Sequence, residues 1–401
     1  MKICGIVSEY NPFHNGHLYQ LEESRRMGAT HIVAVMSGNF VQRGDTAVLD
    51  KFVRAKLAVA CGVDLVLELP VPYCLAPAEV FARGAVYLLD ALGCVAMLSF
   101  GSESGDLPAL RRASRLSAGL SNSPELRGIL EQGSSFPAAM QKLAAREADA
   151  EAADIFAHPN NLLGIEYLKA LAYFRSGITP LTIRRVAAPH DSEISGGGIA
   201  SASYIRKMLR EKVDFQAFLP KCSAEALANY QERGWLASFE RLEPAILYKF
   251  RSMTAQEIQR LPDVSHGLEN RIVSAAQTAS SLEELMFSIK TKRYPMARIR
   301  RILLTGLLGI EKQLLLTPPP YGRILAVNRA GCEILKRAKK TSGIPLGTQL
   351  LKLAKTSPGA ARFVRAETAS TDIYALSGEK IRSGGLDYTA KIQQQNEKVM
   401  I

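Results

Sequence analysis

The sequence lacks any long apolar run, although 47% of its 401 residues are hydrophobic. No stretch reaches the roughly eighteen residues that a membrane-spanning helix needs. The first residues, Met-Lys-Ile-Cys-Gly, contain neither the apolar segment nor the cleavage site of a secretory signal. We therefore expect a cytoplasmic protein. The length and composition predict a sizeable buried core divided among two or three domains.

Cysteines are few and scattered, and they form no CxxC pair and have no neighbouring histidine ligands. This pattern indicates buried free thiols rather than a disulfide framework or a zinc site. The chain also lacks a carboxylate cluster, metal-ligand spacing and an internal repeat. We therefore expect no metal ion held by the protein's own side chains. The six cysteines are Cys4, Cys61, Cys74, Cys94, Cys222 and Cys332.

Acidic residues are scarce in the second half of the chain. Residues 181–401 contain 34 Lys and Arg against 20 Asp and Glu, whereas residues 1–180 contain 16 against 18. This asymmetry predicts one domain for a small molecule and one for a polyanion such as RNA or DNA. Charge alone leaves open that the basic half binds no nucleic acid.

The first twenty residues contain the most informative motif. Residues 2–8 are small and β-branched and predict a buried strand, which ends at the turn-forming Asn11-Pro12. His14-Asn-Gly16-His17 follows and opens a helical pattern. A helix N-terminus offers free N–H groups to a phosphate, glycine allows close approach, and imidazoles can donate to phosphate oxygens. The alternative is that both histidines are ordinary turn and cap residues.

Strands alternate with helices through the first half of the chain. Further buried strands are predicted at residues 31–36, 62–70, 95–101 and 179–186, with helices at 50–60 and 76–92. The alternation predicts an α/β fold with a doubly wound parallel sheet, in which residues 107–155 are a helical insertion. We place this first domain at residues 1–225. Residues 226–401 are predicted to form a mainly helical, basic second domain. A predicted strand at residues 323–328 gives this domain a small α/β element.

Two further segments complete the candidate site. Ser201 and Ser203 lie at the start of a predicted helix, and Arg206 follows one turn later, which favours a second anion site. The alternative there is a serine cap on a basic helix. Asn160 and Asn161 open another helix, and one of their amides is predicted to contact a nucleotide. The alternative for the asparagines is helix capping.

A basic stretch at residues 290–301 contains six Lys and Arg in twelve residues, beside a tyrosine. Such a segment could bind a phosphate backbone and stack a base. The alternative is the solvated basic face of a helix. The candidate RNA-binding residues are Lys292, Arg293, Tyr294, Arg298, Arg300 and Arg301.

The His-x-Gly-His motif, placed directly after an N-terminal strand, resembles the HIGH-type nucleotidyltransferase superfamily. Residues 200–206 resemble the ISSTxIR signature of that superfamily, with departures at Ala200, Ala202 and Ser203 and matches at Ser201 and Arg206. Longer segments resemble the bacterial tRNA-methionine cytidine acetate ligase family. They are residues 5–17, 36–44, 100–103, 161–167, 292–294 and 321–325, so the resemblance covers nearly the whole chain.

The resemblance implies an enzyme that uses ATP and acetate to acetylate the wobble cytidine of elongator methionine tRNA, through an acetyl-adenylate. Mg²⁺ is expected because it accompanies ATP. In this scheme the two motif histidines hold the α- and β-phosphates. Ser201, Ser203 and Arg206 neutralise the departing pyrophosphate.

The resemblance also implies which residues line the ATP site, with Asn161 preferred over Asn160. Two other classes of protein stay open. A small-molecule adenylyltransferase would share the first half of the chain, and a non-catalytic RNA-binding protein would share the basic surface. The implied ATP-site residues are Val7, Ser8, Glu9, Tyr10, Asn11, His14, Gly16, His17, Gln20, Gly101, Asn160, Asn161, Arg184, Arg185 and Val186.

Overall fold

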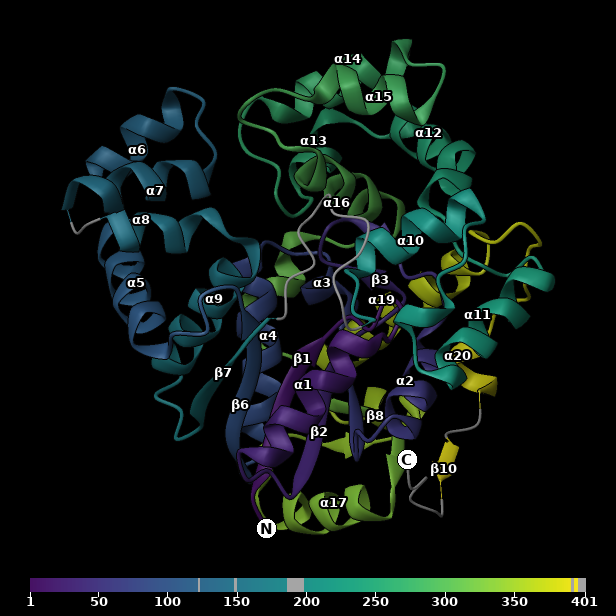
Figure 1. Cartoon of the computed structure of the whole chain (residues 1–401). Coiled ribbons are helices and arrows are strands. Elements are labelled where there is room, and N and C mark those ends of the chain that lie inside the picture. Colours follow the sequence, from purple (N-terminus) through teal and green to yellow (C-terminus); the bar gives the residue numbers. More distant parts are fainter. Residues whose placement is uncertain (122, 148–149, 186–197, 391–392, 396–401) are drawn as a thin grey trace.

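The computed structural model describes residues 1–121, 123–147, 150–185, 198–390 and 393–395. Its centre is one sheet with the strand order β10-β8-β5-β2-β1-β6-β7, and β9 pairs with β8 (Figure 1). The predicted strands are present as parallel neighbours, which confirms the doubly wound sheet. They are β1 (Ile3–Ser8), β2 (His31–Ser37), β5 (Leu65–Leu69), β6 (Val95–Ser102) and β7 (Thr179–Arg184).

The central strands are hydrophobic on both faces because helices cover both faces. Along β2, Ile32, Ala34 and Met36 pack on one side. Val33 and Val35 point to the other side, as the two-residue period of a strand requires. The first face is covered by α1 (Asn15–Arg26) and α2 (Lys51–Ala60), and the second by α4 (Ala78–Ala91), α9 (Pro159–Tyr173) and α17 (Arg329–Thr341).

The last part of the chain returns to the sheet. Strand β8 (Gly322–Asn328) pairs antiparallel with β5, and β9 (Leu346–Gly347) and β10 (Gln393–Gln395) pair parallel with β8. The predicted boundary at residue 225 therefore does not coincide with a boundary of the sheet. The sequence marks residues 323–328 as a strand, but it does not show that the partner lies more than 250 residues earlier.

Buried ion pairs hold this returning segment in place. Lys51 Nζ lies 2.7 Å from Glu68 Oε1 and 2.8 Å from Asp387 Oδ1. Arg323 Nη1 lies 2.9 Å from Glu68 Oε2 and 2.6 Å from Asp387 Oδ1. Glu367 accepts the N–H of Val71, and burial raises its pKa well above the usual range. A protonated Glu367 leaves two cations facing two carboxylates, so the buried cluster is neutral.

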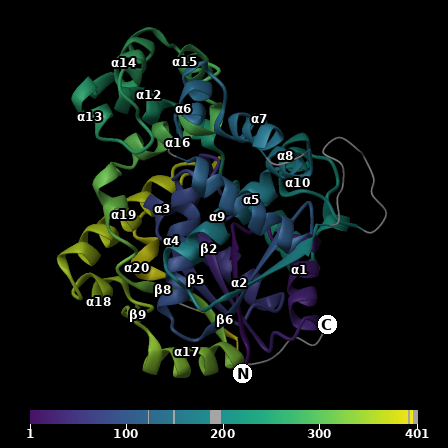
Figure 2. The same ribbon diagram turned by 90° about the vertical axis from the view of Figure 1, so that its left-hand side faces the viewer.

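Two helical bodies lie at the end of the sheet where β1 and β6 finish (Figure 1). One is the predicted insertion, with α5 (Leu107–Leu120), α6 (Pro124–Glu131), α7 (Phe136–Glu147) and α8 (Ala150–Ala157). The other comprises α12 (Glu243–Ser252), α13 (Ala255–Gln259), α14 (Leu268–Thr278), α15 (Leu282–Ile289) and α16 (Met296–Leu307), around an apolar core of its own. A Cβ on Gly133 of the insertion would lie 3.8 Å from Lys292 Cβ, so the two bodies approach each other (Figure 2).

The remaining elements are short connectors and packing helices. Helices α10 (Ala202–Glu211) and α11 (Lys221–Glu232) follow β7, and α11 packs on α2. None of the described helices is long and apolar enough to cross a bilayer. The other elements are β3 (Phe40–Val41), β4 (Asp45–Thr46), α3 (Val71–Cys74), η1 (Gln216–Phe218), η2 (Phe239–Leu242), η3 (Lys312–Leu316), α18 (Leu350–Ala354), α19 (Pro358–Tyr374) and α20 (Leu386–Thr389).

Candidate functional site

The sheet has its topological switch point between β1 and β6. From β1 the chain proceeds to β2 and β5 on one side, and β6 and β7 then follow on the other side. Ligands of open α/β sheets bind outside the carboxyl ends of the strands at such a point. The turn that follows β1 carries the His-x-Gly-His motif and leads into α1.

The two motif histidines form the cap of α1. His14 is the N-cap residue, and its Nδ1 accepts the N–H of Gly16 at 3.1 Å. His17 Nδ1 accepts the N–H of His14 at 3.2 Å, and the two rings stack with centroids 3.8 Å apart. A neutral imidazole that accepts at Nδ1 carries its proton at Nε2. Both rings therefore keep an Nε2–H donor that the cap does not use.

The surroundings keep both imidazoles neutral. Burial, followed by the nearby cations Arg185 and Arg206, lowers the pKa of His14 to about 3. Burial, then His14 and Arg185, hold the pKa of His17 well below its usual range. A polyphosphate beside these rings would oppose the effect of the cations. The cap alternative and the phosphate-binding prediction are thus compatible, because the cap uses Nδ1 and leaves Nε2.

A second helix N-terminus meets the first at this point. Asn15 Nδ2 donates to the carbonyls of Gly198 and Ala217, at 2.8 and 3.1 Å. Ser201 is the N-cap residue of α10, and its Oγ accepts the N–H of Tyr204 at 3.1 Å. The start of α10 therefore lies beside the start of α1, and both present free N–H groups to an anion.

Arg206 joins the two helices. Its Nη1 donates to the carbonyl of Asn11 at 2.8 Å, and its Nη2 lies 3.4 Å from Ser203 Oγ. Ser203 is exposed, so its hydroxyl faces outward from the helix start. Ala200 is buried in the apolar cluster around Ile205, which explains an alanine at that position. The structure thus brings Ser203 and Arg206 together, whereas the Ser201 hydroxyl serves the cap.

The residues before the motif are held by a buried arginine that sequence analysis missed. Arg54 on α2 is fully buried and donates to the carbonyls of Glu9 at 2.6 Å, Ser37 at 3.1 Å and Leu49 at 2.9 Å. It also donates to the carbonyl of Gly38. The guanidinium therefore joins the loops that follow β1 and β2. A charged residue in an amphipathic helix is normally expected on the exposed face, so the sequence gives no sign that Arg54 is buried.

The other predicted residues of this turn have local roles. Ser8 Oγ accepts the N–H of Tyr10 at 3.3 Å, and Tyr10 is buried with a left-handed φ of 45°. Asn11 Oδ1 accepts the N–H of Val48 at 2.9 Å. Gln20 Nε2 donates to the carbonyl of Ser99 at 3.2 Å, which joins α1 to β6. Val7, which lies near the carboxyl end of β1, packs against the sheet core.

The end of β6 and the start of α9 form the opposite wall. A Cβ on Gly101 would lie 3.2 Å from Arg185 Cγ, so a glycine lets that arginine lie across the strand. Arg185 N donates to the carbonyl of Ser102 at 2.9 Å. Arg184 is exposed. A Cβ added at Gly105 would lie only 2.6 Å from the Cβ of Arg184, so the two backbones pass close together. Val186 lies outside the described residues.

The asparagine pair is arranged differently from the prediction. Glu103 caps α9, because its carboxylate accepts the N–H groups of Asn160 and Asn161 at 3.3 and 2.9 Å. Asn161 is 1% exposed, and its Oδ1 accepts the N–H of Ser104 at 3.1 Å. Asn160 is half-buried and donates to Glu103. The preference for Asn161 as the nucleotide contact finds no support in this geometry, since its side chain is buried and bonded inside the loop.

Comparison with known proteins agrees with this geometry. A family model for the HIGH nucleotidyl transferases matches residues 1–387. The tRNA(Met) cytidine acetate ligase of Acetivibrio thermocellus is 40% identical over 98% of this chain and 99% of that protein. The protein of the same name from Alkaliphilus metalliredigens is 40% identical over 94% of each chain. The chain belongs to the tRNA(Met) cytidine acetate ligase family.

Solved structures of the family share the whole fold. The crystal structure of Thermotoga maritima TmcAL bound with alpha-thio ATP has a TM-score of 0.89 and 32% identity, covering 99% of this chain and 100% of that one. The apo form I crystal structure of the same protein has a TM-score of 0.90 at the same identity and coverage. The ATP analogue in the first structure supports nucleotide binding in this family.

The predicted RNA-binding residues do not form one exposed surface. Arg301 is 8% exposed and pairs with Asp263 at 2.7 Å. Arg298 donates to the carbonyl of the same Asp263 at 2.7 Å, and Arg300 pairs with Glu240 at 3.0 Å. The three arginines therefore fix α16 to its neighbours. Arg298 and Arg301 are engaged in these internal contacts, and the joint phosphate-binding surface stays a prediction.

The exposed part of the stretch lies before α16. Lys292 and Arg293 are exposed, whereas Tyr294 is 9% exposed and is flanked by the guanidiniums of Arg293 and Arg298, at 5.8 and 5.1 Å from its ring centroid. Tyr294 thus packs in the helical body and has no free face of the kind that base stacking requires. Lys292 and Arg293 stay candidates.

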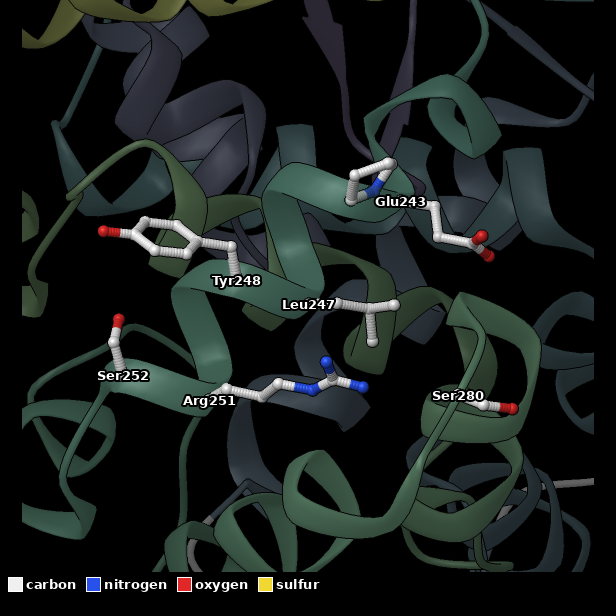
Figure 3. A pocket seen from close by; sticks show the side chains of 7 residues that line it. Glu243, Leu247, Tyr248, Arg251, Ser252 and Ser280 are labelled. Carbon is white, nitrogen blue, oxygen red and sulfur yellow. The ribbon is translucent and has the colours of Figure 1, made fainter.

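A shallow concavity of about 520 Å³ lies on α12 of the helical body (Figure 3). Arg251 extends from this helix toward the segment between α14 and α15 that carries Ser280, whereas Tyr248 points away from it. Arg251 Nη2 already donates to the carbonyl of Ala279 at 2.8 Å, and Glu243 accepts the N–H of Leu282 at 2.7 Å. Since these polar groups are already paired, we assign the concavity no part in the chemistry.

Proposed function

We propose that this protein is a tRNA(Met) cytidine acetate ligase, which uses ATP to join acetate to the exocyclic amine of the wobble cytidine of elongator methionine tRNA. One observation carries the proposal. The N-termini of α1 and α10 meet at the carboxyl ends of β1 and β6, with two neutral imidazoles and Arg206 between them. That arrangement suits a polyphosphate, and the basic residues elsewhere suit a nucleic acid.

In the first step, a carboxylate oxygen of acetate attacks the α-phosphorus of ATP, and pyrophosphate leaves. Attack at phosphorus needs positioning and charge stabilisation rather than a protein nucleophile. The Nε2–H groups of His14 and His17 donate to the phosphate oxygens as negative charge develops on them. Arg206 and Ser203 bind the departing pyrophosphate, and Arg185 approaches from the side of β6.

In the second step, the exocyclic amine of cytosine attacks the carbonyl carbon of acetyl-adenylate, and AMP leaves. The activated anhydride supplies the driving force, and we assign no general base among the residues of the site. Mg²⁺ accompanies ATP in such reactions. In the described part of the chain, no group of three or more His, Cys, Asp or Glu side chains could hold a metal ion. We therefore derive no step through Mg²⁺, and the polyphosphate itself would hold it.

The tRNA is proposed to approach the end of the sheet where the strands finish, between the insertion and the α12–α16 body. Lys292 and Arg293 are exposed, and Lys292 lies beside Gly133 of the insertion. Their charges contact the phosphate backbone and fix the position of the anticodon loop without reading its sequence. A cytoplasmic location follows from these substrates, because charged acetate, ATP and tRNA are cytoplasmic.

One incubation tests the function. Purified protein is mixed with ATP, labelled acetate and unmodified methionine elongator tRNA, and the tRNA is digested to nucleosides. We expect ATP-dependent label in N4-acetylcytidine at the wobble position. Pyrophosphate release with a small acceptor, and no label in RNA, would instead indicate a small-molecule adenylyltransferase. If neither product forms, the remaining alternative is a non-catalytic RNA-binding protein.

The tRNA surface is tested separately. Reversing Lys292 and Arg293 to Glu should weaken tRNA binding and reduce its salt dependence, while pyrophosphate exchange with acetate stays unchanged. Reversing the exposed Lys339 and Lys340 of α17 is the matched control, because that helix lies at the opposite end of the sheet (Figure 1). Equal losses for both pairs would mean a non-specific effect of net charge, and the proposed surface would then be abandoned.

A further inference from the structure

Two cysteines that are far apart in the sequence lie in contact. Cys61 ends α2, and Cys222 lies in the first turn of α11. Their sulfur atoms are 3.4 Å apart, and both thiols are free. Neither residue belongs to the candidate ATP site, and the proposed reaction uses neither. The pair therefore calls for an explanation of its own.

The two thiols differ in acidity for structural reasons. Cys222 is half-buried, and the N-cap residue of α11, Pro220, offers no side-chain cap to the free N–H groups there. The two sulfur atoms share a hydrogen bond, and this bond lowers the pKa of Cys222 to about 7. The same bond, followed by burial, raises the pKa of Cys61. Such an arrangement favours a thiolate at Cys222 and a thiol at Cys61.

The other cysteines provide a contrast within the same chain. Burial raises the pKa of Cys74 and of Cys4, the latter to about 11, so neither is a good nucleophile. Cys332 is exposed on α17, at the other end of the sheet (Figure 1). Reactivity toward oxidants follows thiolate character together with access. Cys222 combines both with a second thiol in contact.

We propose that Cys61 and Cys222 are a peroxide-sensitive thiol pair whose disulfide ties α11 to α2. The Cys222 thiolate attacks one oxygen of a hydroperoxide, the O–O bond breaks, and Cys222 becomes a sulfenic acid while water or an alcohol leaves. Cys61 sulfur then attacks the Cys222 sulfur, the S–O bond breaks, and a second molecule of water carries away the hydroxyl group and the Cys61 proton. The two thiols lose two electrons, which the peroxide accepts.

The geometry needs only a small movement. A disulfide has an S–S length of roughly 2.05 Å, so the sulfurs must approach by about 1.4 Å. Cys61 is buried at the end of α2, and Cys222 packs partly buried against the same apolar cluster near the start of α11. The preceding η1 contains Ala217, whose carbonyl accepts from Asn15 in the first turn of α1. The cross-link thus forms one short segment away from the phosphate-binding turn.

The test is titration of the reduced, full-length protein with hydrogen peroxide. We expect the intact mass to fall by about 2 Da, the free thiols to fall from six to four, and peptide mapping to join the peptides of Cys61 and Cys222. The oxidised protein should melt about 5 °C higher than the reduced one, because the cross-link closes a long loop. A reducing agent should reverse both changes.

Two variants separate the roles of the thiols. In Cys61→Ser, dimedone should trap a sulfenic acid on Cys222, and no disulfide should form. In Cys222→Ser, peroxide should leave Cys61 unmodified. The matched control Cys332→Ser should respond like the unaltered protein. Melting curves of the reduced variants check that each is folded.

The outcome is decided by which cysteine is modified first. Recovery of Cys61 and Cys222 as free thiols, after peroxide has oxidised Cys332, would overturn the proposal. So would a disulfide that links Cys332 of two molecules in place of the internal pair. Neither result depends on ligase activity, so the thiol pair and the proposed function stand or fall independently.

Discussion

The role of His17 can be separated from its role as a cap by a pair of substitutions. His17 occupies the third position of α1, and its Nδ1 accepts the N–H of the N-cap residue His14. Glutamine at this position of a capping box accepts the same N–H. His17→Gln therefore retains the cap but replaces the imidazole Nε2–H by an amide donor at a different position, whereas His17→Ala removes the cap and the donor.

The expected sizes follow from these two functions. Loss of one donor to a developing oxyanion costs about 10²–10³ in rate, or about 3–4 kcal/mol in activation free energy. Loss of a cap costs about 1 kcal/mol in the free energy of unfolding. We therefore expect both variants to lose at least a hundredfold in exchange between ATP and pyrophosphate with acetate present. Only the alanine variant should also lose about 1 kcal/mol of stability.

The assays are isotope exchange at saturating ATP and urea unfolding at pH 7.5. An alanine variant with exchange within threefold of the unaltered protein would refute the assigned donor role, and a glutamine variant with such exchange would show that the imidazole itself is not required. An alanine variant as stable as the glutamine variant would refute the capping argument. Ser24→Ala is a matched control on the same helix, because Ser24 Oγ donates to Ser99 Oγ on β6 at 2.8 Å and Ser24 has no assigned part in the ATP site.

Three further predictions follow from the same site. The folded-state pKa values of His14 and His17 lie below those of the unfolded chain, so the unfolded state binds more protons below about pH 6.5 and stability falls as the pH falls. Between pH 7 and pH 5 we expect the free energy of unfolding to fall by about 2 kcal/mol for each histidine, measured by urea unfolding without ATP. Replacing both histidines by Gln should flatten this pH dependence. Arg54→Lys should raise the KM for ATP about tenfold and lower the free energy of unfolding by about 3 kcal/mol. The reason is that a lysine cannot donate to all the carbonyls that the guanidinium reaches. An unchanged KM would limit Arg54 to a structural role. With Lys292 and Arg293 both reversed, the slope of tRNA affinity against salt should fall by about 2, in filter-binding measurements at several salt concentrations.

Sequence analysis predicted the parts of the fold that depend on local pattern. The strands of the doubly wound sheet were predictable because their residues are almost all apolar, and the start of α1 because of its turn residues. The pairing of β8 with β5 was not predictable, because it depends on a contact between residues far apart in the chain. The cysteine pattern predicted buried free thiols, which is wrong for Cys332 because it lies exposed on α17, and it did not predict that Cys61 and Cys222 meet.

The candidate site shows the same division. His14, His17, Ser203 and Arg206 could be proposed from their order along the chain, and the structure brings their segments together. Asn161 could not be told from Asn160, because the capping carboxylate of Glu103 comes from the loop after β6, far from the pair in sequence. The basic stretch could not be divided into exposed and internal residues.

That last failure has one cause. The partners of Arg300 and Arg301 include Asp45, Glu240 and Asp263, which lie far from the stretch in sequence. A sequence reports the charge of each side chain, but the carboxylates that neutralise it become visible only in three dimensions. Charge counts along a chain therefore overstate the surface available to RNA.

The late arrival of β8 has a consequence for how this protein is made. Strand β5 leaves the ribosome long before residue 322, and until then its outer edge has no partner and Leu65 and Leu67 have only part of their covering. At roughly 5–20 residues per second, the interval lasts some ten to fifty seconds. During that time an unpaired apolar edge is open to pairing with other chains. A chain that stops before residue 322 would lack the partner of β5 and would keep this apolar edge unpaired.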